Sequence, residues 1–210
     1  MAKVISIGNQ SFESIIKEEC FYIDKTAFIK EWWENKDIVT LITRPRRFGK
    51  TLNMDMIKCF FSNEYRDRGD LFEGLDIWKD EKYRELQGTY PVIFLSFAEI
   101  KTKKFEAARE QICFQIVKLY NENEYLYDSG ILTENEKKFF RSVDMDMSDV
   151  ILSTAINQMC CFMQKYYGKK VIVLLDEYDT PMQESYINGY WEELVAVTRS
   201  MFNSTFKTNP

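Results

Sequence analysis

Histidine is absent from the 210-residue sequence, and proline and glycine are scarce, with 4 and 8 residues respectively. Without an imidazole the chain has no histidine general base, no histidine metal ligand and no Ser-His or Cys-His nucleophile pair. Any catalysis must therefore use carboxylates, lysine, arginine, hydroxyl groups or a bound metal ion. The remaining composition, 45% hydrophobic and 29% charged, excludes a disordered chain and is typical of a globular domain.

The sequence also has no apolar run of membrane-spanning length, and its N-terminus lacks the basic-then-apolar order of a signal peptide. Its 5 cysteines form no Cys-x-x-Cys pair and lie among apolar residues, so we expect buried free thiols in a reducing compartment. These features predict a cytoplasmic protein. The net charge of −5 gives no global argument for nucleic-acid binding.

Apolar spacing predicts an α/β fold. Three short apolar runs without helical period, residues 38–43, 91–97 and 170–175, indicate buried strands, and residues 62–90 are the least regular stretch. Strands that are apolar on both faces and separated by long helices indicate a mostly parallel sheet covered by helices. The predicted helices are residues 11–18, 26–34, 51–61, 105–119, 152–166 and 191–206.

The chain is long enough for one domain with its own core. We expect a single domain over residues 1–210, in which a short helical segment, 1–36, precedes a nucleotide-binding core, 37–210.

A phosphate-loop motif lies between the first predicted strand and the helix that follows it. Gly49, Lys50 and Thr51 match the second half of G-x-x-x-x-G-K-[ST], whereas Arg44 stands at the first glycine position. In such loops the backbone N–H groups bind phosphate, the lysine reaches the β- and γ-phosphates, and the hydroxyl ligates Mg²⁺. Because arginine does not readily adopt a positive φ, the start of this loop should differ from the usual one.

The loop arginines have two interpretations. Arg46 and Arg47, together with Arg44, can donate to phosphate oxygens. Alternatively, the motif is a solvated basic turn whose arginines pair with acidic residues at its rim. The candidate nucleotide-binding residues of the loop also include Phe48 and Leu52 on either side of Gly49–Thr51.

An acidic pair follows the most apolar predicted strand. Asp176 ends this run and Glu177 comes next, in the form of a Walker B motif. The aspartate then ligates Mg²⁺, and the glutamate polarises water for attack on the γ-phosphate, which favours hydrolysis over transfer to another substrate. The alternative is a strand that simply becomes polar where it leaves the core.

Three segments carry a resemblance to a known family: Phe-Tyr-Ile-Asp-Lys-Thr at 21–26, the arginine-rich loop within 43–53, and Leu-Leu-Asp-Glu-Tyr-Asp-Thr-Pro at 174–181. Together they resemble the bacterial AAA-ATPase-like family, whose members often carry a PD-(D/E)XK nuclease-like domain at the C-terminus. The arginine at the first glycine position is the pattern of that family. The resemblance implies ATP and Mg²⁺ as ligands and a three-layer α/β/α P-loop fold of the additional-strand type, which includes AAA and STAND proteins.

The resemblance also implies two further site residues and a segment that this sequence lacks. Asp24 and Lys25 would contact the nucleotide base or ribose, although a helix cap beside a surface lysine explains them equally well. The additional strand and its polar sensor residue would follow the helix at 191–206, so we expect the sequence to stop before them. Catalysis would then need the missing segment, and Arg199 or a loop arginine is a candidate arginine finger.

The sequence does not distinguish among three functions. The first is Mg²⁺-dependent ATP hydrolysis, with Lys50 and Glu177 as catalytic residues and Thr51 and Asp176 as metal ligands, coupled to an effector domain or protein partner outside this chain. The second is an interaction module that binds ATP without turnover. The third, a DNA-associated ATPase or nuclease component, is supported only by the family's nuclease-like appendage and the basic residues 44–47.

Overall fold

The computed structural model describes residues 3–43 and 48–207. The chain divides into two compact units, Met1–Val92 and Ile93–Pro210, and each is described by itself below. The segment 1–36 and the residues up to Val92 belong to the same unit.

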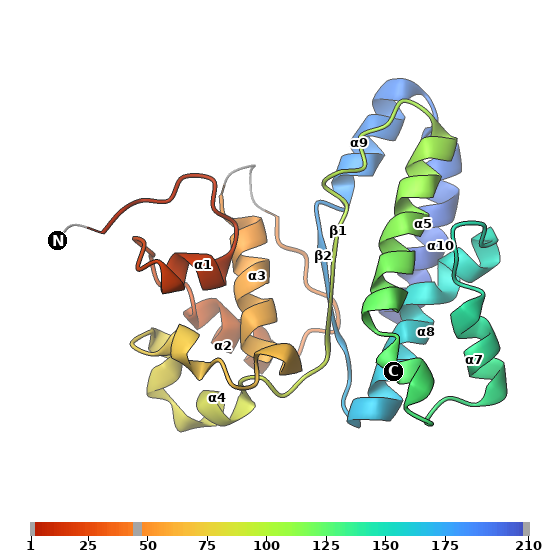
Figure 1. Cartoon of the computed structure of the whole chain (residues 1–210). Helices are drawn as coiled ribbons and strands as arrows, with labels where there is room; N and C mark the ends of the chain where they lie inside the picture. Colours follow the sequence, from red (N-terminus) through yellow and green to blue (C-terminus); the bar gives the residue numbers. More distant parts are fainter. Residues whose placement is uncertain (1–2, 44–47, 208–210) are drawn as a thin grey trace. The chain divides into compact units, whose positions relative to one another are not determined.

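The first unit is helical (Figure 1). Its α1 (Phe12–Lys17), α2 (Ala27–Asn35) and α3 (Lys50–Phe61) confirm the three helices predicted in this part of the chain to within a residue or two. The side chain of Ser11 accepts a hydrogen bond from the Ser14 N–H and caps α1, which is a local signal readable in the sequence. The irregular stretch folds as η1 (Asn63–Tyr65), η2 (Gly69–Phe72), η3 (Asp76–Lys79) and α4 (Glu81–Leu86).

Aromatic side chains form much of the core of this unit. The Phe12 ring of α1 stacks on Phe72 with 5.2 Å between centroids, and Phe60 of α3 meets Phe72 edge-on at 5.2 Å. All three side chains are fully buried. Large rings bury much apolar area for few ordered torsions, and edge or offset contacts add to that gain. The position of α1 against α3 is fixed by this cluster.

Residues 38–43 differ from the prediction. They form no strand, and the side chains of Ile38, Val39 and Leu41 are 91%, 55% and 62% exposed. A strand needs a neighbour that accepts its hydrogen bonds, however β-branched its sequence is. Among the described residues of this unit the one β contact is an isolated bridge between Ser62 and Tyr90. The prediction of a buried strand at 38–43 is therefore wrong.

The sheet is small and parallel. β1 (Val92–Ser96) pairs with β2 (Ile172–Asp176), and the Phe97 N–H donates to the Asp176 carbonyl at 3.0 Å just beyond the ladder (Figure 1). The strands predicted at 91–97 and 170–175 are thus confirmed. The part of the chain that the structure describes has these two strands and no third, so the fold is mixed α/β with a small sheet.

Long helices bury one face of this sheet in the second unit. α5 (Phe105–Glu122), α8 (Asp149–Tyr167) and α10 (Trp191–Lys207) pack on one another, as Figure 1 shows, and confirm three predicted helices. Their core includes Ile93 and Leu95 of β1, which alternate with less buried neighbours. Tyr120 is buried and its hydroxyl donates to the Ala155 carbonyl at 2.9 Å, so this polar group is satisfied inside the core.

Besides α4, three helices of the second unit are not found from apolar spacing. They are α6 (Tyr125–Asp128), α7 (Glu134–Arg141) and α9 (Asp179–Asn188). The helix α6 has only 4 residues, and the buried residues of α9 are Thr180, Pro181 and Ser185, so neither helix has a stripe of large apolar side chains. A local signal existed for α7, where Thr133 and Glu136 form a reciprocal capping box.

The cysteines are free thiols as predicted: four are buried and Cys161 is half-buried. Burial raises the pKa of Cys59 and of Cys160 to about 12, so both remain protonated and unreactive at neutral pH. No helix in the described ranges is both long and apolar enough to cross a membrane.

An ion-pair cluster fastens α1 to the irregular stretch. Lys17 Nζ lies 2.7 Å from Glu13 Oε1, and the Arg68 guanidinium donates to the same carboxylate. Hydrogen bonds from Lys17 and then Arg68 lower the Glu13 pKa from 4.5 to about 2. A carboxyl with a depressed folded pKa stabilises the fold above its unfolded pKa, and this contribution is lost as the pH falls through the folded pKa.

We therefore expect Glu13→Gln to lower the free energy of unfolding at neutral pH by about 1 kcal/mol or less, since the pair is partly exposed. The difference from wild type should persist above about pH 5 and shrink toward zero near about pH 2. Urea unfolding followed by tryptophan fluorescence measures it, because Trp32, Trp33 and Trp78 lie in this unit. Glu85→Gln, at an exposed helical position, is the control. If the stability of both variants depended on pH in the same way, the ion pairs of Glu13 would not be the stabilising contact.

Candidate functional site

Gly49 has a left-handed backbone conformation at the start of α3. Its φ is 73° and its ψ 26°, which glycine adopts without the strain that a side chain would bring. The Gly49 carbonyl accepts from the Asn53 N–H at 3.0 Å, so Lys50 and Thr51 are the first two helical residues. The N–H groups of a helix's first turn have no intrahelical acceptors and carry the positive end of the helix dipole. This end of α3 therefore suits an anion.

Lys25 lies against this glycine. A methyl group placed on Gly49 would be 3.7 Å from the Lys25 Nζ. The lysine side chain is half-buried, and among the described residues its ammonium makes no hydrogen bond or ion pair. The structure thus brings together Lys25, from the segment at residues 21–26, and the glycine of the phosphate-loop motif, which the sequence separates by two dozen residues.

Tyr22 anchors the backbone of Lys25 to α3. The Lys25 N–H donates to the Tyr22 hydroxyl at 3.4 Å, and that hydroxyl lies 3.2 Å from the Met56 sulfur. Burial raises the Tyr22 pKa to about 12, which keeps the hydroxyl protonated and able to donate. The Tyr22 ring also packs edge-on against Phe12 at 5.5 Å between centroids. The backbone that carries Lys25 is therefore fixed relative to the phosphate-loop helix.

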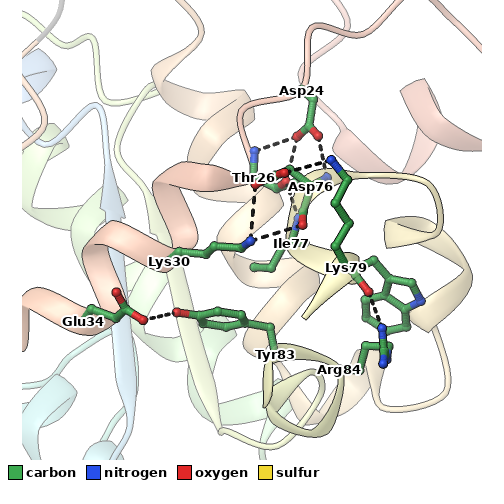
Figure 2. A network of polar contacts seen from close by, with 10 residues as sticks. Asp24, Thr26, Lys30, Glu34, Asp76, Ile77, Lys79, Tyr83 and Arg84 are labelled. Carbon is green, nitrogen blue, oxygen red and sulfur yellow. Dashed lines mark hydrogen bonds and ion pairs between the residues drawn. The ribbon is translucent and has the colours of Figure 1, made fainter. Parts of the chain in front are cut away.

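Asp24 uses both of its carboxylate oxygens inside the unit (Figure 2). Oδ1 accepts from the Thr26 N–H at 2.8 Å and from the Thr26 hydroxyl at 2.7 Å, and Oδ2 accepts from the Asp76 N–H at 2.7 Å. Thr26 is fully buried, and its hydroxyl accepts from the Ile77 N–H at 3.1 Å. Lys30 Nζ lies 3.3 Å from Asp76 Oδ2. The network joins the start of α2 to η3, so Asp24 positions its own segment.

The acidic pair belongs to the second unit, at the carboxyl end of β2. Val173 and Leu175 pack against the core of that unit, and Asp176 follows on the opposite face by the alternation of a strand. The Asp176 side chain is nevertheless only 3% exposed. Burial of a carboxylate at the end of a strand is costly unless partners compensate it, and such positions are frequent in functional sites.

Glu177 has an unusual backbone conformation. Among the described residues three non-glycine positions have a positive φ, and two of them, Glu19 and Lys36, follow helix ends where such residues are common. Glu177, with φ at 51°, instead lies in the turn from β2 to α9. This conformation costs about 1–2 kcal/mol outside glycine. Thr180 compensates by donating its N–H to the Glu177 carbonyl and its hydroxyl to Oε2, both at 3.0 Å.

Sequence reasoning missed Thr180 and Tyr22 as supports of the site. Both act through hydrogen bonds to a predicted residue, Glu177 or Lys25. A threonine three residues after the glutamate was visible in the sequence, but nothing there showed the left-handed turn that makes the contact.

The remaining predicted residues are placed as follows. Phe48 is 61% exposed, Leu52 is half-buried on α3, and Arg199 is exposed on α10. The loop arginines Arg44, Arg46 and Arg47 lie outside the described residues. Gly49, Lys50 and Thr51 belong to the first unit, and Asp176 and Glu177 to the second.

Within the described ranges no group of three or more Cys, Asp and Glu side chains is placed to hold a metal ion. Mg²⁺ usually takes one or two protein oxygens and completes its shell with water and substrate phosphate. The single buried carboxylate of Asp176 fits that kind of site.

Asp24→Ala should destabilise the first unit by about 2–3 kcal/mol, because three hydrogen bonds to a charged acceptor are lost and the Thr26 hydroxyl stays buried. Urea unfolding of wild type and variant measures the change. Asp67→Ala is the matched control, since this exposed aspartate makes no hydrogen bond or ion pair within the described part of the chain. Equal stabilities of the two variants would show that the network is not structural.

Comparison with known proteins gives one family and one curated relative. The family model AAA-ATPase_like, described as "Predicted AAA-ATPase", matches residues 6–209. An uncharacterized protein in the vnfD 5′ region of Azotobacter chroococcum mcd 1 is 26% identical over 185 residues, which are 87% of this chain and 30% of that protein. The chain thus spans less than a third of the relative's length. No solved structure matches this chain.

Proposed function

The chain belongs to the predicted AAA-ATPase family, and from this premise we propose that it binds Mg-ATP at the N-terminus of α3. The observation that carries the proposal is the left-handed Gly49 directly before Lys50 and Thr51 at the start of a twelve-residue helix. Sequence motif, backbone conformation and helix end agree on an anion site. The proposed fold of the intact domain is the three-layer, additional-strand P-loop type, of which β1 and β2 form part.

Phosphate binding is assigned to the loop and the first helical turn. Backbone N–H groups from Phe48 to Leu52 would donate to phosphate oxygens, and the Lys50 ammonium would neutralise the β- and γ-phosphates. The side chains of Arg44, Arg46 and Arg47 are proposed as further donors, since guanidinium groups bind phosphate with two parallel hydrogen bonds.

Mg²⁺ is the metal proposed for this site. The Thr51 hydroxyl and the Asp176 carboxylate are oxygen ligands of the kind that Mg²⁺ prefers. The bound ion would neutralise charge that develops on the phosphate oxygens. Two protein ligands would leave most of the shell to water and phosphate, as is usual for Mg²⁺.

Glu177 is the proposed general base for ATP hydrolysis. With no histidine in the chain, a carboxylate is the residue type available to accept a proton from the attacking water. Its backbone is held in a left-handed turn by Thr180, and strained backbone of this kind is characteristic of functional positions. Turnover would serve an effector domain or partner protein, in keeping with a relative more than three times as long as the matched segment.

Lys50→Ala should weaken Mg-ATP binding at least about 10-fold, because a buried charge-assisted contact to phosphate is lost. Isothermal titration calorimetry of both proteins with Mg-ATP measures this. Lys58→Ala is the control on the same helix, two turns away from the loop, and should bind as wild type does. Equal affinity of wild type and Lys50→Ala would refute the proposed site.

Glu177→Gln should abolish turnover while sparing Mg-ATP binding. The amide cannot accept the proton of the attacking water, and loss of a general base typically slows a reaction by about 100-fold or more. Phosphate release measures the rate, calorimetry the affinity, and the exposed Glu193→Gln is the control. If wild type binds ATP without releasing phosphate and Glu177→Gln behaves identically, the chain is a nucleotide-gated interaction module instead.

A further inference from the structure

We propose that Lys25 is a second phosphate-binding lysine of this site, so that the phosphate chain of the ligand, and not its base or ribose, lies against the segment at residues 22–26. The inference rests on the proposed function and specifies which part of the nucleotide contacts the segment at residues 22–26. It assigns to Lys25 a role different from the base or ribose contact that the family resemblance implied.

The first argument is the position of the ammonium. Lys25 Nζ is 3.7 Å from the point that a Cβ on Gly49 would occupy. In a phosphate loop this glycine lets the backbone approach the phosphate closely, and its N–H is among the donors. A cation beside it is beside the bound phosphate oxygens as well. Lys25 and Lys50 then contribute two positive charges from different segments of the first unit.

The second argument is chemical. An ammonium has three donors and no acceptor, and phosphate oxygens are acceptors that carry charge. Among the described residues the Lys25 ammonium has no carboxylate partner to neutralise it. A ribose hydroxyl can also accept from an ammonium, but it carries no charge to neutralise one. The neighbouring Asp24 already accepts hydrogen bonds from Thr26 and Asp76 through its two oxygens. A polyanion is therefore the ligand chemistry that suits the segment.

The third argument is preorganisation. The Lys25 backbone is tied to α3 through Tyr22 and Met56, and the adjacent Asp24 is tied to η3 (Figure 2). A segment held on both sides loses little conformational entropy when a ligand binds, so more of the contact energy appears as affinity. Tyr22 and Asp24 are positioning residues in this arrangement, and Lys25 is the residue that touches the ligand.

The test compares two ligands that share a phosphate chain and differ in everything else, Mg-ATP and Mg-tripolyphosphate. Calorimetry with wild type and Lys25→Gln should show both ligands weakened by the same factor, about 10- to 100-fold as for a lost charge-assisted contact. Lys25→Arg keeps the charge and should restore most of the affinity for both ligands. Lys3→Gln, which removes an exposed lysine of the same unit, should change neither affinity.

Two outcomes would overturn the inference. If Lys25→Gln weakens Mg-ATP but leaves Mg-tripolyphosphate unchanged, the lysine contacts the base or ribose. If neither affinity changes, it is a surface lysine. Thermal unfolding of each variant separates a loss of binding from a loss of fold.

The Lys50→Ala variant distinguishes a refuted role of Lys25 from a refuted phosphate site. If Lys50→Ala loses Mg-ATP binding while Lys25→Gln retains it, the phosphate site stands and only the role of Lys25 is refuted. If wild type does not bind Mg-ATP, or Lys50→Ala binds as well as wild type, the proposed function fails and the role of Lys25 fails with it.

Discussion

The start of α3 depends on the left-handed backbone of Gly49. The helix α1 begins after an extended residue, Ser11, whereas α3 begins after a left-handed one, a conformation that glycine adopts without the cost that a Cβ imposes. The direction of the helix sets where its N–H groups point, and the Lys25 ammonium lies beside Gly49, 3.7 Å from the point that a Cβ would occupy. The conformation of this one residue therefore orients the end of the helix.

The first unit holds that helix end by two different means. Fully buried rings of α1, α3 and η2 fix the helices against one another through apolar area and edge contacts. The polar network of Asp24, Thr26 and Asp76 fixes the residues directly before α2, and the Tyr22 ring packs against Phe12 earlier in the same connection. Packing therefore positions the helix and hydrogen bonds position the segment beside it. In the second unit Thr180 has the corresponding role for Glu177.

Much of the fold was predictable because long helices and apolar strands leave a periodic signal. α3, α5, α8 and α10 and both strands were found from spacing alone. Residues 38–43 were not, because the strand signal reports side-chain type whereas a strand is made by a hydrogen-bonded neighbour, and their side chains are exposed here. For the site, the motif residues were found from their order, and a helix cap at Asp24 was a local possibility. The contacts of Asp24 with Asp76 and of Tyr22 with Met56 join positions that carry no joint signal in the sequence.

The sequence by itself determined the residue types from which this protein can build a site: no imidazole, one Gly-Lys-Thr loop, and one acidic pair after an apolar run. It also indicated the start of α3 to within one residue, because a turn-like loop that contains glycine comes directly before the apolar spacing of that helix. Only the tertiary structure decided that Lys25 lies beside Gly49, that Asp24 is engaged in holding its own segment, and that Glu177 adopts a left-handed turn. These are long-range or context-imposed contacts, whose energies exist only once the surrounding elements have packed.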